Sequence, residues 1–337
     1  MEFVKKNLTT TIDWVLVAAV LPLLGAGLVT MDAFAGRNIF FTHQLVWIAV
    51  SLLVFFGVSM LDMRFLKRTG VLVTLFALSA AVLLALFVLG HTAKGATSWF
   101  DLGGFSFQPS DPVKLLVILM LAKYFSRRHV EIGHFKHILV SGVYALIPFI
   151  LVLLQPDFGS AIIIFLIWFG MIMVSGVSRK HLLTVFAVGA VVFAGLWMFL
   201  FADYQKARIM NFINPLADIH GSGWNAYQST IAVGSGELLG KGVGYGTQSR
   251  LKFLPEYQTD FVFAAFAEEW GFVGVALLFL LFGVVIWRVL ANALVGEGNF
   301  EMLFGMGLAV FFMAHFIVNV GMNMGLAPVT GIPLPFL

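Results

Sequence analysis

The sequence predicts an all-α polytopic membrane protein, built as a helical bundle of about nine spans in a single domain over residues 1–337. Hydrophobic residues make up 60% of the chain and charged residues only 11%, and the mean hydropathy is +0.98. Water-soluble domains do not have this composition. Apolar runs of about 20 residues, the length that crosses a bilayer core roughly 30 Å thick, follow one another along the chain. Lys and Arg gather in alternate loops, a pattern typical of spans with a fixed orientation.

The apolar runs place the spans along the chain. We expect helices near residues 14–31, 43–61, 71–90, 112–125, 138–154, 159–177, 182–201, 261–287 and 301–324. The fourth is short but has a clear start, because Asp111 is a favourable N-cap and Pro112 suits the first helical position. The first run has no small-residue cleavage pattern and leads into further spans, so we do not expect a cleaved signal sequence.

Basic residues predict the orientation, because loops rich in Lys and Arg stay in the cytoplasm. The basic residues that follow this alternation are Lys5, Lys6, Arg64, Lys67, Arg68, Lys123, Arg127, Arg128, Lys136, Arg179, Lys180 and Arg288. The N-terminus is therefore expected on the cytoplasmic side. The intervening loops are short and poor in Lys and Arg, except for one long segment at about 202–260, between the seventh and eighth helices. We expect this segment to be extracytoplasmic.

Composition also excludes several classes of function. The chain has no cysteine, which excludes disulfides, a thiol nucleophile and thiolate metal ligands. The net charge of +3 does not indicate nucleic-acid binding, because the basic residues are spread over loops as topology requires and no aromatic platform accompanies them. The glycines of residues 234–246 do not form a phosphate loop, since no strand precedes them and no Gly-Lys-Ser/Thr ending follows.

Ionisable residues near the outer ends of the spans are candidates for function, because burying a charge is costly. Asp111 and Lys114 open the fourth helix, Asp157 lies in a tight turn, and Asp260, Glu268 and Glu269 open the eighth helix. Lys114 beside Asp157 would neutralise both charges and leave Asp260 as an acidic group, suited to act as a general base in a partly dry cleft. An alternative remains open, since carboxylates are also favoured at helix starts by the macrodipole.

The long segment at 202–260 contains aromatic and aliphatic residues throughout, so we expect it to fold back onto the bundle. It also contains cations that could donate charge-assisted hydrogen bonds to a phosphate-bearing substrate. These are Arg208, Lys241, Arg250 and Lys252. Solvation at the membrane interface is an equally good explanation for any one of them.

In the ninth helix, His315, Asn319 and Asn323 recur every four residues and therefore lie on one face. Gly321 and Gly325 add a small-xxx-small pattern that favours close helix contact. A proton relay would need a carboxylate partner that this helix does not supply. We therefore favour helix-to-helix contact over catalysis for this face.

Short runs along residues 95–337 then carry a resemblance to a known family. They are Phe107-Gln108-Pro109-Ser110, Gln155-Pro156-Asp157, Gln228-Ser229, Gly240-Lys241-Gly242, Gly246-Thr247-Gln248-Ser249, Phe253-Leu254-Pro255-Glu256, Thr259-Asp260-Phe261-Val262-Phe263, Ala267-Glu268-Glu269 and Gly331-Ile332-Pro333-Leu334-Pro335. In this order they resemble the signature of the SEDS family, and its cell-elongation branch more than its cell-division branch. The family has ten spans, so the resemblance implies that the family's last helix is absent from residues 1–337.

The resemblance implies a peptidoglycan glycosyltransferase of the bacterial cytoplasmic (inner) membrane. It would polymerise lipid II, an undecaprenyl-diphosphate-linked disaccharide pentapeptide, into glycan strands on the extracytoplasmic face during cell elongation. Implied partners are a class B penicillin-binding protein and other elongation-complex proteins. No cofactor is implied with certainty, although a divalent cation, Mg²⁺ or Mn²⁺, would suit a diphosphate leaving group.

By the same resemblance, the family's essential acid falls on Asp260, and its Lys and Asp that pair across a cavity fall on Lys114 and Asp157. The segment at 202–260 becomes the catalytic loop. Asp260 would take the acceptor's proton while the loop cations stabilise the departing diphosphate. Supporting residues implied by the shared motifs are Gln108, Asp111, Gln228, Glu256, Glu268 and Glu269. Asp111 departs from the family pattern, which usually has Glu there.

Two other functions would use the same features. A lipid II flippase would need the same cavity and cations, but a transporter with alternating access should have polar groups near the membrane midplane and internal repeats. The sequence shows no convincing repeat, and its charges cluster at one face. A non-catalytic scaffold that activates a penicillin-binding protein would not need an intact Asp260 motif.

Overall fold

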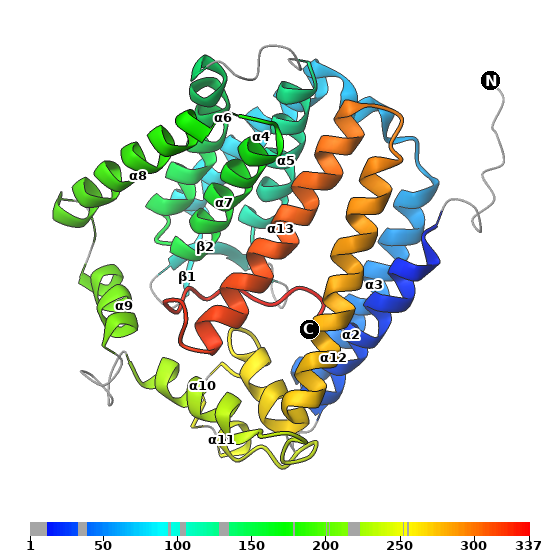
Figure 1. The fold of residues 1–337 in the computed structure, drawn as a ribbon, viewed down its shortest axis with the longest axis vertical. Coiled ribbons are helices and arrows are strands. Elements are labelled where there is room, and N and C mark those ends of the chain that lie inside the picture. Colours follow the sequence, from blue (N-terminus) through cyan, green and yellow to red (C-terminus); the bar gives the residue numbers. More distant parts are fainter. Residues whose placement is uncertain are drawn as a thin grey trace. The chain divides into compact units, whose positions relative to one another are not determined.

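A computed structural model describes residues 12–32, 39–93, 96–101, 106–127, 135–177, 179–199, 201, 203–214, 223–251, 253–254 and 256–337. Its helices, shown in Figure 1, are α2 (Trp14–Asp32), α3 (Ile39–Met60), η1 (Met63–Lys67), α4 (Thr69–Leu89), α5 (Ser110–Ser126), α6 (Phe135–Leu154), α7 (Phe158–Val174), α8 (Arg179–Phe199), α9 (Asp203–Ile213), α10 (Trp224–Ser235), α11 (Thr247–Arg250), α12 (Val262–Leu294) and α13 (Asn299–Asn323).

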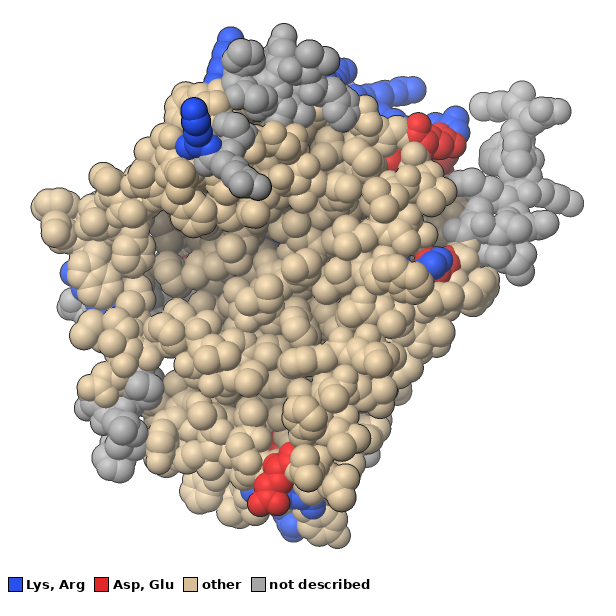
Figure 2. Space-filling view, viewed as in Figure 1, with Lys and Arg blue, Asp and Glu red and all other residues tan. Residues whose placement is uncertain are grey.

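Within the described residues, a helix lies at each of the nine predicted positions, so the prediction of an all-α polytopic bundle is confirmed. Seven of these helices, α2, α3, α4, α6, α8, α12 and α13, are long and apolar enough to cross a membrane. The other two, α5 and α7, have 17 residues each. Charged side chains cover little of the surface seen in Figure 2, as expected for helices that face lipid.

The start of the fourth predicted span differs from the prediction. Helix α5 begins at Ser110, and Pro109 is its N-cap residue, so Asp111 lies inside the first turn and is not the cap. The prediction placed the start at Pro112 because proline favours the first helical position. Proline is also tolerated elsewhere in the first turn, where the backbone N–H has no intrahelical partner.

A small antiparallel sheet precedes α5 and was not predicted. Its strands are β1 (His91–Ala93), β2 (Ala96–Asp101) and β3 (Ser106–Phe107), in the order β1-β2-β3. The Ser98 hydroxyl of β2 donates to the carbonyl of Gln155, at the turn before α7. Gln155 is itself buried and donates through Nε2 to the Leu83 carbonyl of α4. The sheet is thereby attached to the helices around it.

The chain divides into two compact units that do not follow chain order. The first unit consists of Met1–Asp62, Ala202–Arg288 and His315–Leu337, and the second of Met63–Phe201 and Val289–Ala314. Helices α12 and α13 each contribute residues to both units.

The second unit has its core around α5, α6 and α7, which contact one another. Its largest fully buried side chains include Leu83, Ile118, Leu121, Phe125, Ile163 and Ile164. Lipid tails are as apolar as these side chains, so close van der Waals packing, rather than removal of apolar surface from water, is the main contribution that they make to holding the helices together.

In the first unit, an ion pair joins the beginning of the chain to α12. Asp13 lies just before α2, and its Oδ2 is 2.8 Å from Nε of Arg288. Helix α3 contacts α2 in the same unit. The C-terminal segment passes close to α2, since a Cβ added at Gly27 would lie 2.7 Å from the carbonyl carbon of Leu337.

Candidate functional site

The segment after α10 packs against α12 where that helix is broken. At Gly271 the backbone is non-helical, with φ 64° and ψ −166°. Residues 237–242 lie along residues 268–273 and share four backbone hydrogen bonds with them: Lys241 N–H to the Glu268 carbonyl (2.9 Å), Gly242 N–H to Glu269 (3.0 Å), Phe272 N–H to Glu237 (2.9 Å) and Val273 N–H to Leu238 (3.1 Å). This part of the long segment therefore folds back onto the bundle, as expected.

Close backbone approach explains one of the glycines in this segment. A Cβ added at Gly240 would lie 2.1 Å from the Glu269 carbonyl oxygen, and the residue has φ 79°. Only glycine fits such a position without displacing backbone. The glycine at this position thus has a packing role.

The Glu268 carboxylate of α12 accepts hydrogen bonds from Lys241 and from residues 247–249 of the preceding segment. Its side chain is 0% exposed. It accepts hydrogen bonds from the Lys241 ammonium (2.7 Å), the Thr247 hydroxyl (3.1 Å), the Gln248 N–H (3.0 Å) and both the N–H (3.4 Å) and hydroxyl (3.3 Å) of Ser249. These donors satisfy both oxygens of the buried Glu268 carboxylate and fix the residues that surround it.

The loop cations therefore differ in what they can do. Lys241, predicted as a phosphate donor, is paired with Glu268, and its side chain is 28% exposed. Arg250 ends α11 and is exposed. Lys252 and the side chain of Arg208 lie outside the described residues, so their predicted roles are not addressed by the structure.

Glu269 is buried beside this cluster. Its Oε1 accepts from the Gly244 N–H at 2.9 Å. Its Oε2 has no hydrogen-bond partner within the described part of the chain. The two adjacent carboxylates thus have different environments: Glu268 is saturated by donors and Glu269 is half satisfied.

Asp260 lies two residues before the start of α12, at the end of a tight turn. The Glu256 carbonyl starts the turn by accepting from the N–H groups of Thr259 and Phe261, both at 3.2 Å. Phe261 and Leu254 are fully buried in one apolar cluster against α10, which also includes Ala232 and Ala264. The Asp260 side chain is partly exposed. Asp260 is thus partly exposed and directly precedes a residue of a packed apolar cluster, Phe261.

Tyr257, in the same turn, packs against this cluster. Burial raises the pKa of the Tyr257 phenol, and the hydrogen bond that Gln258 Nε2 donates to its oxygen at 2.7 Å acts in the opposite direction. The phenol therefore stays protonated at neutral pH and adds no charge near Asp260.

The polar face of α13 contacts the backbone of Asp260. The side-chain amides of Asn319 and Asn323 both donate to the Asp260 carbonyl, at 3.2 and 3.1 Å. His315, on the same face, is buried, and its Nδ1 lies 3.3 Å from the Pro333 carbonyl. The Ser229 hydroxyl of α10 also donates to Asn323, at 2.9 Å, so this face meets another helix, as predicted. Its other partners are the C-terminal segment and a proposed site residue, Asp260. Gln228, another predicted site residue, is buried on α10.

The remaining predicted site residues form a separate group in the second unit. Lys114 Nζ is 2.8 Å from Asp111 Oδ1, and the Lys114 side chain is 3% exposed whereas that of Asp111 is 59% exposed. Asp157 caps α7 by accepting from the Ser160 N–H at 2.9 Å, and its Oδ2 accepts from Gln108 Nε2 at 2.8 Å. These four predicted residues therefore lie in one hydrogen-bonded neighbourhood at the starts of α5 and α7.

The sequence predicts a direct pair of Lys114 and Asp157, but in the structure each of these residues has another partner. Lys114 reaches Asp111 because residues three apart lie on the same side of a helix. Asp157 is occupied by capping α7 and by Gln108. The predicted ring of charges that would include Asp260 stays a prediction, because Asp260 belongs to the first unit and this group to the second.

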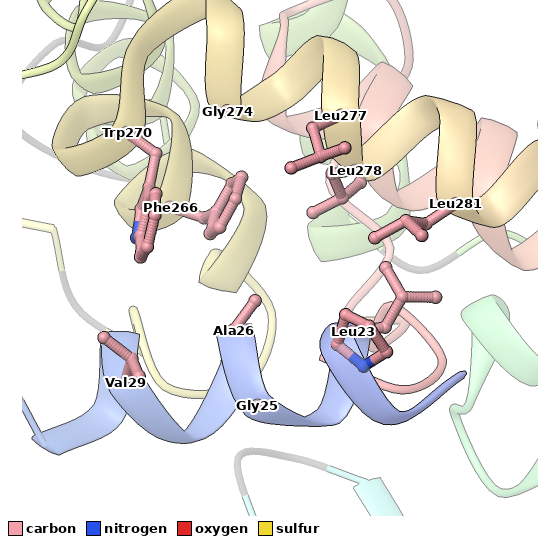
Figure 3. Close-up of a pocket in the computed structure, with 11 residues that line it drawn as sticks. Leu23, Gly25, Ala26, Val29, Phe266, Trp270, Gly274, Leu277, Leu278 and Leu281 are labelled. Atoms are coloured by element: carbon pink, nitrogen blue, oxygen red, sulfur yellow. The ribbon is translucent and has the colours of Figure 1, made fainter. Parts of the chain in front are cut away.

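An apolar cavity of about 220 Å³ lies between α2 and α12 in the first unit. Figure 3 shows that it is lined by Leu23, Gly25, Ala26 and Val29 of α2 and by Phe266, Trp270, Gly274, Leu277, Leu278 and Leu281 of α12, with Pro22 completing the wall. Its lining suits hydrocarbon and offers nothing to bind a phosphate or a sugar. Among the described residues no group of three or more His, Cys, Asp or Glu side chains is placed to hold a metal ion, so the divalent cation stays a prediction.

The chain is similar to known proteins over nearly all its length. A family model described as cell cycle protein, for FtsW, RodA and SpoVE, matches residues 6–337. Peptidoglycan glycosyltransferase MrdB of Escherichia coli (strain K12) is 38% identical over 263 residues, which are 78% of this chain and 71% of that protein. Stage V sporulation protein E of Bacillus subtilis (strain 168) is 34% identical over 340 residues, 97% of this chain and 92% of that protein.

Solved structures agree with these similarities. A structure described as "Structural coordination of polymerization and crosslinking by a peptidoglycan synthase complex" is 30% identical with a TM-score of 0.82, covering 96% of this chain and 90% of that chain. The rod shape determining protein RodA of Thermus thermophilus is 28% identical with a TM-score of 0.69, covering 96% of this chain and 89% of that chain.

Proposed function

The chain belongs to the SEDS family of FtsW, RodA and SpoVE cell cycle proteins, close to RodA and MrdB, and we propose that it is a peptidoglycan glycosyltransferase that polymerises lipid II during cell elongation. Relatives named as peptidoglycan glycosyltransferases support the activity. The observation that supports assigning this activity to particular residues is the environment of Asp260. Its carboxylate is partly exposed at the start of α12, while its backbone is held by two buried amides.

Asp260 acts as the general base in this proposal. The acceptor sugar hydroxyl loses its proton to the Asp260 carboxylate as its oxygen attacks the anomeric carbon of the donor. The bond between that carbon and the diphosphate oxygen breaks, and its electron pair leaves with the polyprenyl diphosphate. Direct displacement inverts the anomeric centre. A base within hydrogen-bond reach of the hydroxyl contributes about 10²–10⁴-fold to such a step.

Developing charge on the leaving diphosphate needs cations nearby. Arg250 is the described loop cation best suited, because it is exposed at the end of α11. Arg208 and Lys252 remain candidates from the sequence. Lys241 has a different part in this proposal: its pairing with Glu268 holds the loop in place. Lys114, Asp111, Gln108 and Asp157 would support substrate at the starts of α5 and α7.

The protein is a multi-pass membrane protein. Its proposed place is the bacterial inner membrane, with the N-terminus in the cytoplasm and the catalytic loop on the extracytoplasmic face. The distribution of Lys and Arg over alternate loops supports this orientation. A class B penicillin-binding protein is the proposed partner, since a related chain belongs to a complex that coordinates polymerization and crosslinking.

Polymerisation of labelled lipid II by the purified protein, together with its class B penicillin-binding protein, tests the proposal. Wild type is compared with Asp260→Ala and with a matched control, Glu297→Ala, which removes an exposed carboxylate that pairs loosely with Arg64. Wild type and control should form long glycan chains, and Asp260→Ala should form none while remaining folded and partner-bound. Equal activity of Asp260→Ala would show that Asp260 is not the base. A wild type that moves lipid II across vesicles but does not polymerise it would favour the flippase.

A further inference from the structure

Two buried asparagines of α13 hold the main chain of Asp260. Asn319 and Asn323 are one helical turn apart, and each is 0% exposed. Nδ2 of Asn319 donates to the Asp260 carbonyl at 3.2 Å and to the Ile332 carbonyl at 2.7 Å. Nδ2 of Asn323 donates to the same Asp260 carbonyl at 3.1 Å and to the Asn319 carbonyl at 2.8 Å. One backbone oxygen thus receives two side-chain donors.

The position of that oxygen explains what the amides do for it. The hydrogen-bond ladder of α12 begins with the Ala265 N–H, which donates to the Phe261 carbonyl at 3.1 Å. The Asp260 carbonyl lies one residue before this first acceptor, at the junction between the turn and the helix. Main-chain atoms at such a junction are not fixed by the helix itself. The two amides supply that restraint from another helix.

The asparagines are themselves restrained. The Ser229 hydroxyl of α10 donates to the backbone and side-chain oxygens of Asn323, at 2.9 and 3.1 Å. The Asn323 amide also approaches Oδ1 of Asn319 at 3.4 Å. Three elements therefore converge on Asp260: α10 through Ser229, α13 through the amides, and the C-terminal segment through Ile332.

The same C-terminal segment reaches the carboxylate of Asp260. A Cβ added at Gly331 would lie 3.5 Å from Oδ2 of Asp260. The amides thus fix the backbone of Asp260 and the chain that borders its carboxylate as one unit. Burying two primary amides is costly unless every polar atom finds a partner, and here the partners are supplied at the residue that carries the proposed base.

We propose that Asn319 and Asn323 are positioning residues for Asp260, which act by holding its main chain so that the carboxylate meets the acceptor hydroxyl. The inference rests on the proposed function, because it concerns the base of that reaction. Reacting groups must be held within a few tenths of an ångström, and a displacement of about 1 Å costs about 10²-fold in rate. Loss of either amide should therefore lower the turnover number and leave the half-saturating concentration of lipid II unchanged.

The experiment compares Asn319→Ala and Asn323→Ala with Met322→Ala. Met322 lies between the two asparagines on α13 and is 0% exposed. Its truncation removes buried packing, and the weak contact of the Thr330 hydroxyl with its sulfur at 3.6 Å, without removing an amide. Thermal unfolding is measured for each protein, and polymerisation is measured at saturating and subsaturating lipid II, well below each unfolding midpoint. If an asparagine variant does not fold, Ser229→Ala replaces it, since that change removes only the hydroxyl that orients the Asn323 amide.

We expect each asparagine variant to lose about 10- to 100-fold in turnover number at unchanged half-saturation, with Ser229→Ala changing in the same direction by less. Met322→Ala should keep its turnover number although its unfolding midpoint falls. The inference is overturned if the asparagine variants lose no more activity than Met322→Ala at equal loss of stability, or if only their half-saturating concentration changes. Asp260→Ala in the same assay separates the two claims: an active Asp260→Ala refutes the base assignment itself, whereas an inactive one leaves the asparagine variants to decide the positioning role.

Discussion

Substitution of Gly271 by alanine tests how the loop preceding Asp260 is attached to α12. The backbone angles at Gly271, φ 64° and ψ −166°, lie in a region that is almost exclusive to glycine, and another residue there costs about 1–3 kcal/mol. The added Cβ would also lie 2.2 Å from the Gly240 nitrogen and 2.7 Å from the Leu239 carbonyl carbon. Both are backbone atoms, which cannot rotate away as a side chain would.

Relief of that overlap requires residues 237–242 to move away from the break in α12. Four backbone hydrogen bonds join the two segments, and each contributes about 0.5–1.5 kcal/mol net. We therefore expect Gly271→Ala to lower the free energy of unfolding by at least about 3 kcal/mol. By the scaling known for soluble domains, the thermal midpoint should fall by about 6 °C or more.

The assay is thermal unfolding in detergent, followed by intrinsic fluorescence, with Gly283→Ala as the matched control. Gly283 lies in the same helix, and a Cβ added there meets nothing within 4 Å. This control should be neutral or stabilised by up to about 1 kcal/mol, because alanine is the better helix former. If Gly271→Ala melts as high as Gly283→Ala, the reasoning about the broken helix and its docked loop is refuted.

Three further changes test other parts of the structure. Glu268→Gln should lower the free energy of unfolding, measured by thermal unfolding, by about 3–5 kcal/mol, because it leaves the Lys241 ammonium without its buried partner. The double variant with Lys241→Met should lose less than the sum of the two single losses. A loss equal to that sum would argue against the pair. Asp157→Ala should lower the free energy of unfolding by about 0.5–2 kcal/mol, through loss of the α7 cap and of the Gln108 contact. Asp157→Asn keeps an acceptor oxygen and should therefore unfold at a temperature closer to that of wild type. Equal losses in the two variants would contradict the capping role. Ala26→Leu should fill part of the cavity between α2 and α12 and raise the free energy of unfolding by about 1 kcal/mol. A lower thermal midpoint than that of wild type would mean that the cavity does not accept the added atoms.

Much of the fold could be predicted because spans depend on local composition. A run of about 20 apolar residues is a helix in a bilayer almost regardless of its neighbours, since its backbone groups must be satisfied within the segment. The same argument fails for short elements. The strands of 91–107 have no comparable run, and their pairing depends on contacts such as that of Ser98 with the Gln155 carbonyl. A glycine inside an apolar run is only a weak signal for the break at Gly271, because Gly274 and Gly283 lie in the same run and do not break the helix.

The candidate site was only partly predictable. The sequence indicated Asp260 and the carboxylates around it, and the spacing of Asn319 and Asn323 showed that they share a face. It did not indicate that this face contacts the Asp260 backbone. It indicated Asp157 as the partner of Lys114, whereas in the structure Lys114 pairs with Asp111.

The sequence by itself determined the class of the protein, the nine helices at its apolar runs, its family and the residue types available for chemistry, because these follow from composition and short motifs. It did not indicate α9, α10 and α11 in the long segment. The tertiary structure decided which donor meets which acceptor. Lys241 is drawn into an ion pair with Glu268, and two amides from α13 converge on one carbonyl next to α12. These outcomes depend on distances between segments far apart in the chain, and a difference of a few ångströms decides whether a polar group is paired, orphaned or available to a substrate.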